Sequence, residues 1–192
     1  MVGCCPSLGR SYRVHPAEDS GEVLLLGCEQ SGKTLLSRHL QVLAAAASKA
    51  PPLNAKTQPT IGTEIAHLAH KRKAFTLREV GGSMMPVWPR FFEACRAVVF
   101  VADSSSEVAS GSPVVEWHNL LAAPPLQSKP ALLIFNKRDS EHALPDLTLR
   151  TQFRMSELDM SGKDRAITVL PVSALTGDGL AAVLDWIAEH LT

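Results

Sequence analysis

Hydrophobic residues along the chain gather in short runs that are separated by mixed or polar segments. Four of these runs, Val23–Leu26, Ala97–Ala102, Ala131–Phe135 and Ile167–Val172, are almost entirely apolar. Continuous apolar runs of this length are typical of strands that are buried on both faces of a sheet. The pattern therefore predicts at least four interior strands.

Segments with helical character lie between these runs. Good helix formers extend from Lys33 to about Ser48, Pro113–Ala123 has helical potential, and Leu180–Leu191 forms a closing amphipathic pattern. Glu64–His70 and Ala74–Val80 resemble two strands of a hairpin at a sheet edge. Alternation of buried strands with helices predicts an α/β fold, a doubly wound and mostly parallel sheet with helices on both faces.

The 192 residues suit one domain, with residues 21–192 as its body. Residues 1–20 mix glycine, proline and polar residues without a helical or strand period, so we expect a flexible N-terminal tail. The 19 basic and 19 acidic residues cancel, and this balance argues against a nucleic-acid partner. Apolar runs are too short to span a bilayer, and four cysteines are too few for a disulfide framework. We expect a monomer in the reducing cytoplasm.

The segment from Gly27 to Thr34 reads G-C-E-Q-S-G-K-T and fits the phosphate-binding pattern G-x-x-x-x-G-K-[ST]. It lies between a predicted strand and a predicted helix, which is the context that the pattern requires. Glycines let successive N–H groups and the helix N-terminus face phosphate oxygens. Lys33 would reach the β- and γ-phosphates, and the Thr34 hydroxyl would ligate Mg²⁺. The other predicted phosphate-binding residues are Gly27, Glu29, Gln30, Ser31 and Gly32.

Two later segments distinguish between nucleotides. The sequence Asn136-Lys137-Arg138-Asp139 follows a predicted strand at the carboxyl edge, where open α/β sheets bind ligands. The Asp139 carboxylate could accept from the ring N–H and the exocyclic amine of guanine, a pair that adenine lacks. A loop of Ser173, Ala174 and Leu175 follows another strand, and its backbone N–H suits the guanine carbonyl. These features favour a GTP-binding protein over the alternative of a P-loop kinase or ATPase.

Two further motifs carry a family resemblance. Pro59-Thr60-Ile61-Gly62 and the segment Arg78–Ser83, which reads R-E-V-G-G-S, resemble the P-T-I-G and W-D-V-G-G-Q motifs of the Arf-like branch of the Ras superfamily. The R-E-V-G-G form and the long segment before Pro59 are most similar to a divergent member. The resemblance covers roughly residues 21–192 and implies a P-loop NTPase (small GTPase) fold.

The resemblance also implies a GTP-binding molecular switch that cycles between GTP and GDP with Mg²⁺ as its metal. Thr60 would then ligate Mg²⁺ and report the γ-phosphate, so that loss of that phosphate releases its loop. The backbone N–H of Gly82 would contact the γ-phosphate. Effectors, an exchange factor and an activating protein are the implied partners, in intracellular signalling or in membrane and ciliary traffic.

Two positions depart from the family pattern. Glu79 stands where the family has aspartate, and it would have to bind Mg²⁺ through water from a shifted position, which octahedral Mg²⁺ tolerates poorly. Ser83 replaces the glutamine that orients the attacking water, so Ser83 is a weak catalytic candidate beside Thr60. We therefore expect slow GTP hydrolysis, and the alternative is a GTP-bound scaffold with little or no hydrolysis.

Departures also concern partners and membranes. Of the three positions that form the family's aromatic effector cluster, Thr63, Arg78 and Phe91, only the last is aromatic, so we expect a poor fit to the usual effectors. Val2 takes the place of the glycine that is myristoylated in many family members, which removes that anchor. Cys4 and Cys5 could accept palmitate, although unmodified cysteines are the simpler interpretation. Peripheral membrane association stays open.

Overall fold

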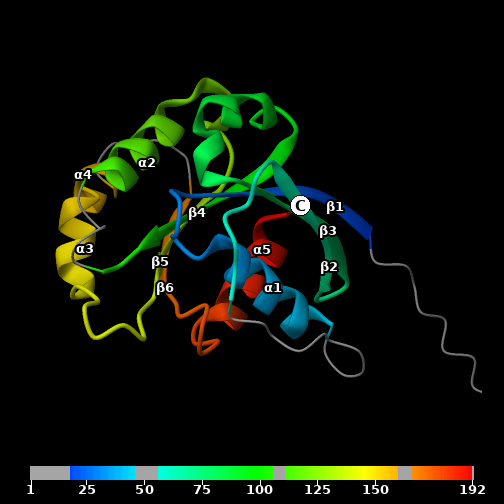
Figure 1. Ribbon diagram of the computed structural model, residues 1–192. Coiled ribbons are helices and arrows are strands. Elements are labelled where there is room, and N and C mark those ends of the chain that lie inside the picture. Colours follow the sequence, from blue (N-terminus) through cyan, green and yellow to red (C-terminus); the bar gives the residue numbers. More distant parts are fainter. Residues whose placement is uncertain (1–17, 46–55, 106–110, 160–165, 192) are drawn as a thin grey trace, which may run out of the picture.

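The fold is a six-stranded sheet between two layers of helices (Figure 1). The computed structural model describes residues 18–45, 56–105, 111–159 and 166–191. The strand order is β2-β3-β1-β4-β5-β6, and all neighbours are parallel except β2 and β3, which confirms the predicted doubly wound α/β sheet. The strands are β1 (Glu18–Leu26), β2 (Thr63–His70), β3 (Lys73–Val80), β4 (Cys95–Asp103), β5 (Ala131–Asn136) and β6 (Ile167–Pro171).

Helices cover both faces of the sheet. Residues of α1 and α5 pack into one hydrophobic core, and residues of η1, α2 and α3 pack into the other. In the described residues, no helix is long and apolar enough to cross a membrane. The helices are α1 (Lys33–Ala44), η1 (Gly82–Phe91, 3₁₀), α2 (Ser112–Ala122), η2 (Pro124–Leu126, 3₁₀), α3 (Asp146–Gln152), α4 (Met155–Asp159) and α5 (Leu180–His190).

The central strands are apolar on both sides because each side meets a different core. On β4, Val99 and Val101 enter the core under α1 and α5, whereas Val98 and Phe100 enter the core under η1 and α2. All four side chains are at most 1% exposed. The alternation explains why the sequence reads as a continuous apolar run rather than as alternating polar and apolar residues.

The β2–β3 hairpin forms one edge of the sheet. Its two-residue turn places Lys71 and Arg72 at φ 47° and 67°, as expected for a turn that matches strand twist. At the tip, Asp185 of α5 lies 2.6 Å from His70 Nε2 and 2.9 Å from Lys71 Nζ. At the other end, β2 begins and β3 ends beside the phosphate loop, which brings Glu79 to the nucleotide side of the sheet.

Some element boundaries differ from the sequence predictions. β1 begins at Glu18, inside the segment predicted to be a tail, because backbone pairing with β3 from Lys73 onward extends the strand through polar residues that carry no hydrophobic signal. Helix α1 ends at Ala44, and the rest of its predicted length reaches into residues 46–55, which lie outside the described part of the chain. Residues 1–17, with Val2, Cys4 and Cys5, also lie outside it. The division into a tail and a domain stays a prediction.

Candidate functional site

The phosphate loop between β1 and α1 is a tight backbone turn. Gly27 has φ 148°, and a Cβ there would lie 2.3 Å from the carbonyl oxygen of Val101 on β4. Gly32 has φ 91°, and a Cβ there would lie 2.4 Å from the Nδ2 atom of Asn136. Gln30, between them, also has a positive φ of 60°. The glycines of the motif are therefore required by conformation and by close approach to the neighbouring strands.

Lys33 is the buried cation of this loop. Its side chain is 5% exposed, and its Nζ donates hydrogen bonds to the carbonyl oxygens of Gly27, at 2.9 Å, and Cys28, at 2.8 Å. Burial lowers the pKa of the Lys33 ammonium, and the nearby carboxylate of Glu79 opposes that shift. An anion in the loop would compensate the buried positive charge, which is the role expected of a phosphate.

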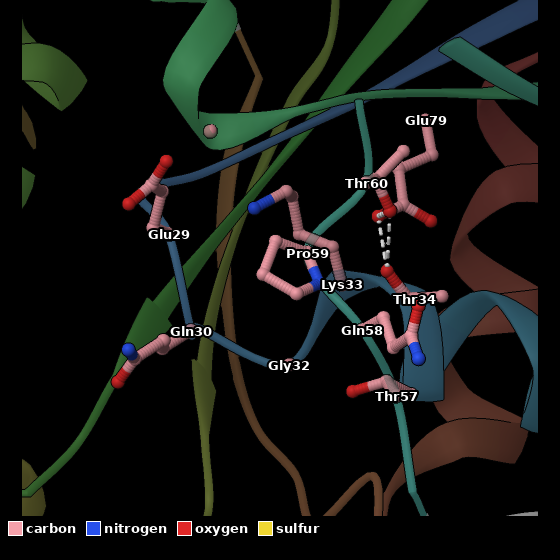
Figure 2. A pocket seen from close by; sticks show the side chains of 11 residues that line it. Glu29, Gln30, Gly32, Lys33, Thr34, Thr57, Gln58, Pro59, Thr60 and Glu79 are labelled. Atoms are coloured by element: carbon pink, nitrogen blue, oxygen red, sulfur yellow. Dashed lines mark hydrogen bonds between the residues drawn. The ribbon is translucent and has the colours of Figure 1, made fainter. Parts of the chain in front are cut away.

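Beside Lys33 lies a cavity of about 320 Å³ (Figure 2). The phosphate loop and the start of α1 form one wall, and the segment before β2 with the end of β3 forms the other. Its lining residues are Glu29, Gln30, Gly32, Lys33, Thr34, Thr57, Gln58, Pro59, Thr60, Glu79 and Gly82.

Three oxygen-bearing side chains meet at one side of this cavity (Figure 2). The hydroxyl oxygens of Thr34 and Thr60 are 2.9 Å apart, and Glu79 Oε1 accepts hydrogen bonds from Thr34 at 2.6 Å and from Thr60 at 3.2 Å. Glu79 is 1% exposed, and its buried Oε2 has no hydrogen-bond partner within the described part of the chain. Burial raises the pKa of this carboxyl, while the hydrogen bond from Thr34 and the charge of Lys33 oppose the rise. Two hydroxyl oxygens beside a buried carboxyl group form an oxygen set that suits a hard divalent cation such as Mg²⁺.

The residues predicted to hold the base form a second, connected network. Asn136 is 1% exposed, its Nδ2 donates to the carbonyl oxygen of Ser31 at 2.8 Å, and its Oδ1 accepts from the backbone N–H of Ala174 at 2.9 Å. Ser173 Oγ donates to Asp139 Oδ1. One side chain thus joins the phosphate loop to both predicted base-binding loops.

Gly81 and Gly82, which follow β3, approach the Thr60 segment and the phosphate loop closely. A Cβ on Gly82 would lie 2.4 Å from the backbone nitrogen of Glu29, and a Cβ on Gly81 would lie 2.2 Å from the carbonyl oxygen of Thr60. Ser83, the next residue, is exposed and does not line the cavity. The structure therefore brings Gly82 and Thr60 together at the cavity beside the phosphate loop and leaves the side chain of Ser83 outside.

A sequence model of the ADP-ribosylation factor family matches residues 11–191. The chain belongs to the Arf family. As an Arf-family small GTPase, it is a GTP-binding switch with guanine nucleotide as its ligand.

Individual relatives agree with this assignment. The chain is 34% identical to human ADP-ribosylation factor-like protein 16 over 96% of this chain and 93% of that protein. It is 29% identical to ADP-ribosylation factor-like protein 1 of Saccharomyces cerevisiae over 87% of this chain and 85% of that protein. Among solved structures, the Arl6 BBS3 small GTPase of Trypanosoma brucei, bound to GppNp, matches with a TM-score of 0.72, 21% identity and coverage of 89% of this chain and 98% of that chain. That structural match supports the fold.

Sequence reasoning missed several residues of this Arf-family site. Thr57 and Gln58 line the cavity, but they precede the Pro59 motif in a segment without hydrophobic period. Asp103, at the end of β4, is 4% exposed and pairs with Lys137 Nζ at 2.6 Å. In the register of β4 with β5, Asp103 lies opposite Asn136. The sequence signal that could have found Asp103 is a polar residue directly after the predicted strand Ala97–Ala102. Leu175, which the sequence did predict, is half exposed beside the base-binding network.

Proposed function

We propose that this Arf-family protein binds GTP and GDP with Mg²⁺ and hydrolyses GTP slowly without a partner. The observation that carries the proposal is a contrast within one site. Thr34, Thr60 and Glu79 converge on the cavity within hydrogen-bond distance, whereas Ser83 lies exposed outside it. The side chains that would hold nucleotide and metal lie together, whereas the side chain that replaces the family's water-orienting glutamine lies exposed outside the cavity.

The residues of the site fit the nucleotide and its metal. Lys33 would neutralise phosphate charge from inside the loop, and the hydroxyls of Thr34 and Thr60 would bind Mg²⁺ beside Glu79. When bound, Mg²⁺ neutralises charge that develops on the phosphate oxygens. At the other end, the Asp139 carboxylate would accept from guanine. Each assignment uses a side chain whose position and partners support it.

Water positioning is the task that this site performs poorly. Phosphoryl transfer depends on positioning and charge stabilisation, and family members use a glutamine amide to orient the attacking water. The shorter hydroxyl of Ser83 cannot place a donor and an acceptor where the glutamine amide would, and the side chain does not line the cavity. Slow unassisted hydrolysis follows from these two features.

Single-turnover phosphate release with saturating Mg²⁺ tests the proposal. We expect a rate at or below about 10⁻⁴ per second, the scale of unassisted small-GTPase hydrolysis. A rate above roughly 10⁻² per second would contradict the proposal, because another group would then have to orient the water. Nucleotide binding is measured separately, so that slow release is not confused with an empty site.

A GTP-bound scaffold with little turnover is the second candidate, and the position of Ser83 outside the cavity favours it. Identification of the nucleotide carried by the purified protein separates the two: GDP favours the slow switch, and GTP favours the scaffold. In either case we propose a cytoplasmic protein that acts with effectors and regulators in signalling or in membrane and ciliary traffic. The family membership is the support for this wider role.

A further inference from the structure

Glu79 is one methylene longer than the aspartate that the family places at this position. Its Oε1 lies 2.6 Å from the Thr34 hydroxyl oxygen and 3.2 Å from the Thr60 hydroxyl oxygen, and the two hydroxyl oxygens lie 2.9 Å from each other. The three oxygens therefore form a compact triangle.

The dimensions of this triangle match one face of an octahedral Mg²⁺ site. Mg²⁺ binds oxygen at about 2.0–2.1 Å in near-ideal octahedral geometry, so adjacent ligand oxygens lie about 2.9 Å apart. The three oxygen–oxygen distances of 2.6, 2.9 and 3.2 Å lie around that value. Two corners of the triangle are the hydroxyls that are expected to ligate the metal, and the third is a carboxylate oxygen.

The surroundings of the carboxylate also favour a cation in direct contact. Glu79 is 1% exposed, and among the residues that the structure describes its Oε2 has no hydrogen-bond partner, while Oε1 accepts from the two hydroxyls. A buried carboxylate with so few donors is costly unless a positive charge lies close to it. Lys33 is directed to the loop carbonyl oxygens of Gly27 and Cys28 instead of to the Glu79 oxygens.

We propose that Glu79 ligates the Mg²⁺ of the bound nucleotide directly through Oε1, in place of the intervening water that the sequence led us to expect. The inference rests on the proposed nucleotide and metal binding. An anionic carboxylate in place of a neutral water strengthens metal binding. It also leaves one fewer water on the metal than an aspartate at the same position would leave.

Mn²⁺ bound with GppNp is the probe, because water ligands on Mn²⁺ broaden its electron paramagnetic resonance lines in ¹⁷O-enriched water. We expect the unaltered full chain to show one fewer water ligand than Glu79→Asp, whose shorter carboxylate retains its charge but acts through a water. Glu79→Gln should weaken Mn²⁺ binding by more than the roughly 10- to 100-fold that loss of an outer-shell partner costs. Glu64→Gln is the matched control: Glu64 is opposite Glu79 in the β2–β3 register but is exposed, and its loss should leave the water count unchanged.

The outcomes separate this inference from the function on which it rests. If the unaltered protein and Glu79→Asp bind GppNp and show equal water counts, the carboxylate acts through water, and direct ligation is overturned while the proposed function stands. If the unaltered protein binds no guanine nucleotide, both proposals fall. A normal thermal unfolding transition for Glu79→Asp, which keeps the charge, shows that a changed count reflects ligation and not loss of fold.

Discussion

The two ends of the site differ in how completely their polar groups are satisfied. The base end comprises Asn136–Asp139 and Ser173–Leu175, and the switch end comprises Thr60, Glu79, Gly82 and Ser83. At the base end, the amide of Asn136 has partners at both of its atoms, Ser173 donates to Asp139, and Lys137 pairs with Asp103. At the switch end, one buried oxygen of Glu79 has no partner among the described residues, and the side chain of Ser83 is exposed outside the cavity. Residues at the base end follow the family motif, and the substitutions gather at the switch end.

Holding a nucleotide and turning it over make different demands on one fold. The base end needs only a fixed set of donors and acceptors, which the buried network supplies. The switch end must also position metal and water for the transition state, where small displacements are costly. Substitutions confined to the switch end can therefore slow hydrolysis while recognition of guanine is retained.

The largest expected effect is at the base end. Replacing Asp139 with Asn should weaken GTP binding by about 1,000-fold. One of the two carboxylate oxygens that would accept from guanine becomes an NH₂ group, which donates instead. Inosine triphosphate, which lacks the exocyclic amine, should lose much less, and titrations of both nucleotides measure the difference. The control is Asp146→Asn, which removes a carboxylate paired with Arg150 on α3. Equal competition by ATP and GTP for the unaltered protein would contradict the assignment.

Lys33 tests the part of the site that both ends share. Lys33→Ala should reduce GTP affinity by about 100-fold, since a buried cation that pairs with phosphate is removed, and Thr34→Asn should cause a similar loss with Mg²⁺ present. Equilibrium binding of a fluorescent GTP analogue measures both variants. Lys71→Ala, which removes a surface ammonium that pairs with Asp185, should leave affinity unchanged. If both site variants bind like the original, phosphate does not occupy this loop.

Asn136 tests whether the base end also organises the phosphate loop. Asn136→Ala leaves the carbonyl oxygen of Ser31 and the N–H of Ala174 without their partner in buried surroundings, so we expect a loss of about 2 kcal/mol in the free energy of unfolding. Denaturant titration measures it. Asn119→Ala, at an exposed position of α2, should change stability little. A stable Asn136→Ala protein would show that the loop holds its shape without this bridge.

The sequence predicted the sheet and the base end better than the switch end, and the reasons are physical. Apolar runs such as Ala131–Phe135 report burial on both faces, and fixed motifs report backbone geometry, so these elements were identified. The short helix α3 was missed, although Asp146 lies in its first turn and Leu149 and Phe153 are buried four residues apart. The 3₁₀ helix η1 contains Pro86 and Pro89, which hide any helical pattern.

Tertiary contacts account for the remaining gaps. Nothing in the sequence around Glu79 shows that its carboxylate reaches two hydroxyls on separate segments, because that depends on how Thr60 lies against Gly81. The pairing of Lys137 with Asp103 likewise depends on the β4–β5 register. The roles of the individual site residues stay predictions until binding and hydrolysis are measured.

The smallest expected effect is a partial repair of the switch end. Ser83→Gln alone should raise the single-turnover hydrolysis rate little, because Glu79 still sets a metal geometry that differs from that of the family. Glu79→Asp alone restores the shorter carboxylate but provides no amide to orient water. Groups that act as a unit are not additive, so the hydrolysis rate of the double variant should exceed that of the unaltered protein by about 10-fold, which is more than the sum of the two single gains.

Phosphate release at saturating Mg²⁺ and equal nucleotide loading measures the rate of all four proteins. Additive gains would show that metal geometry and water orientation act independently here. Glu79 and Ser83 would then be two unrelated substitutions at the switch end, and not parts of one altered catalytic unit.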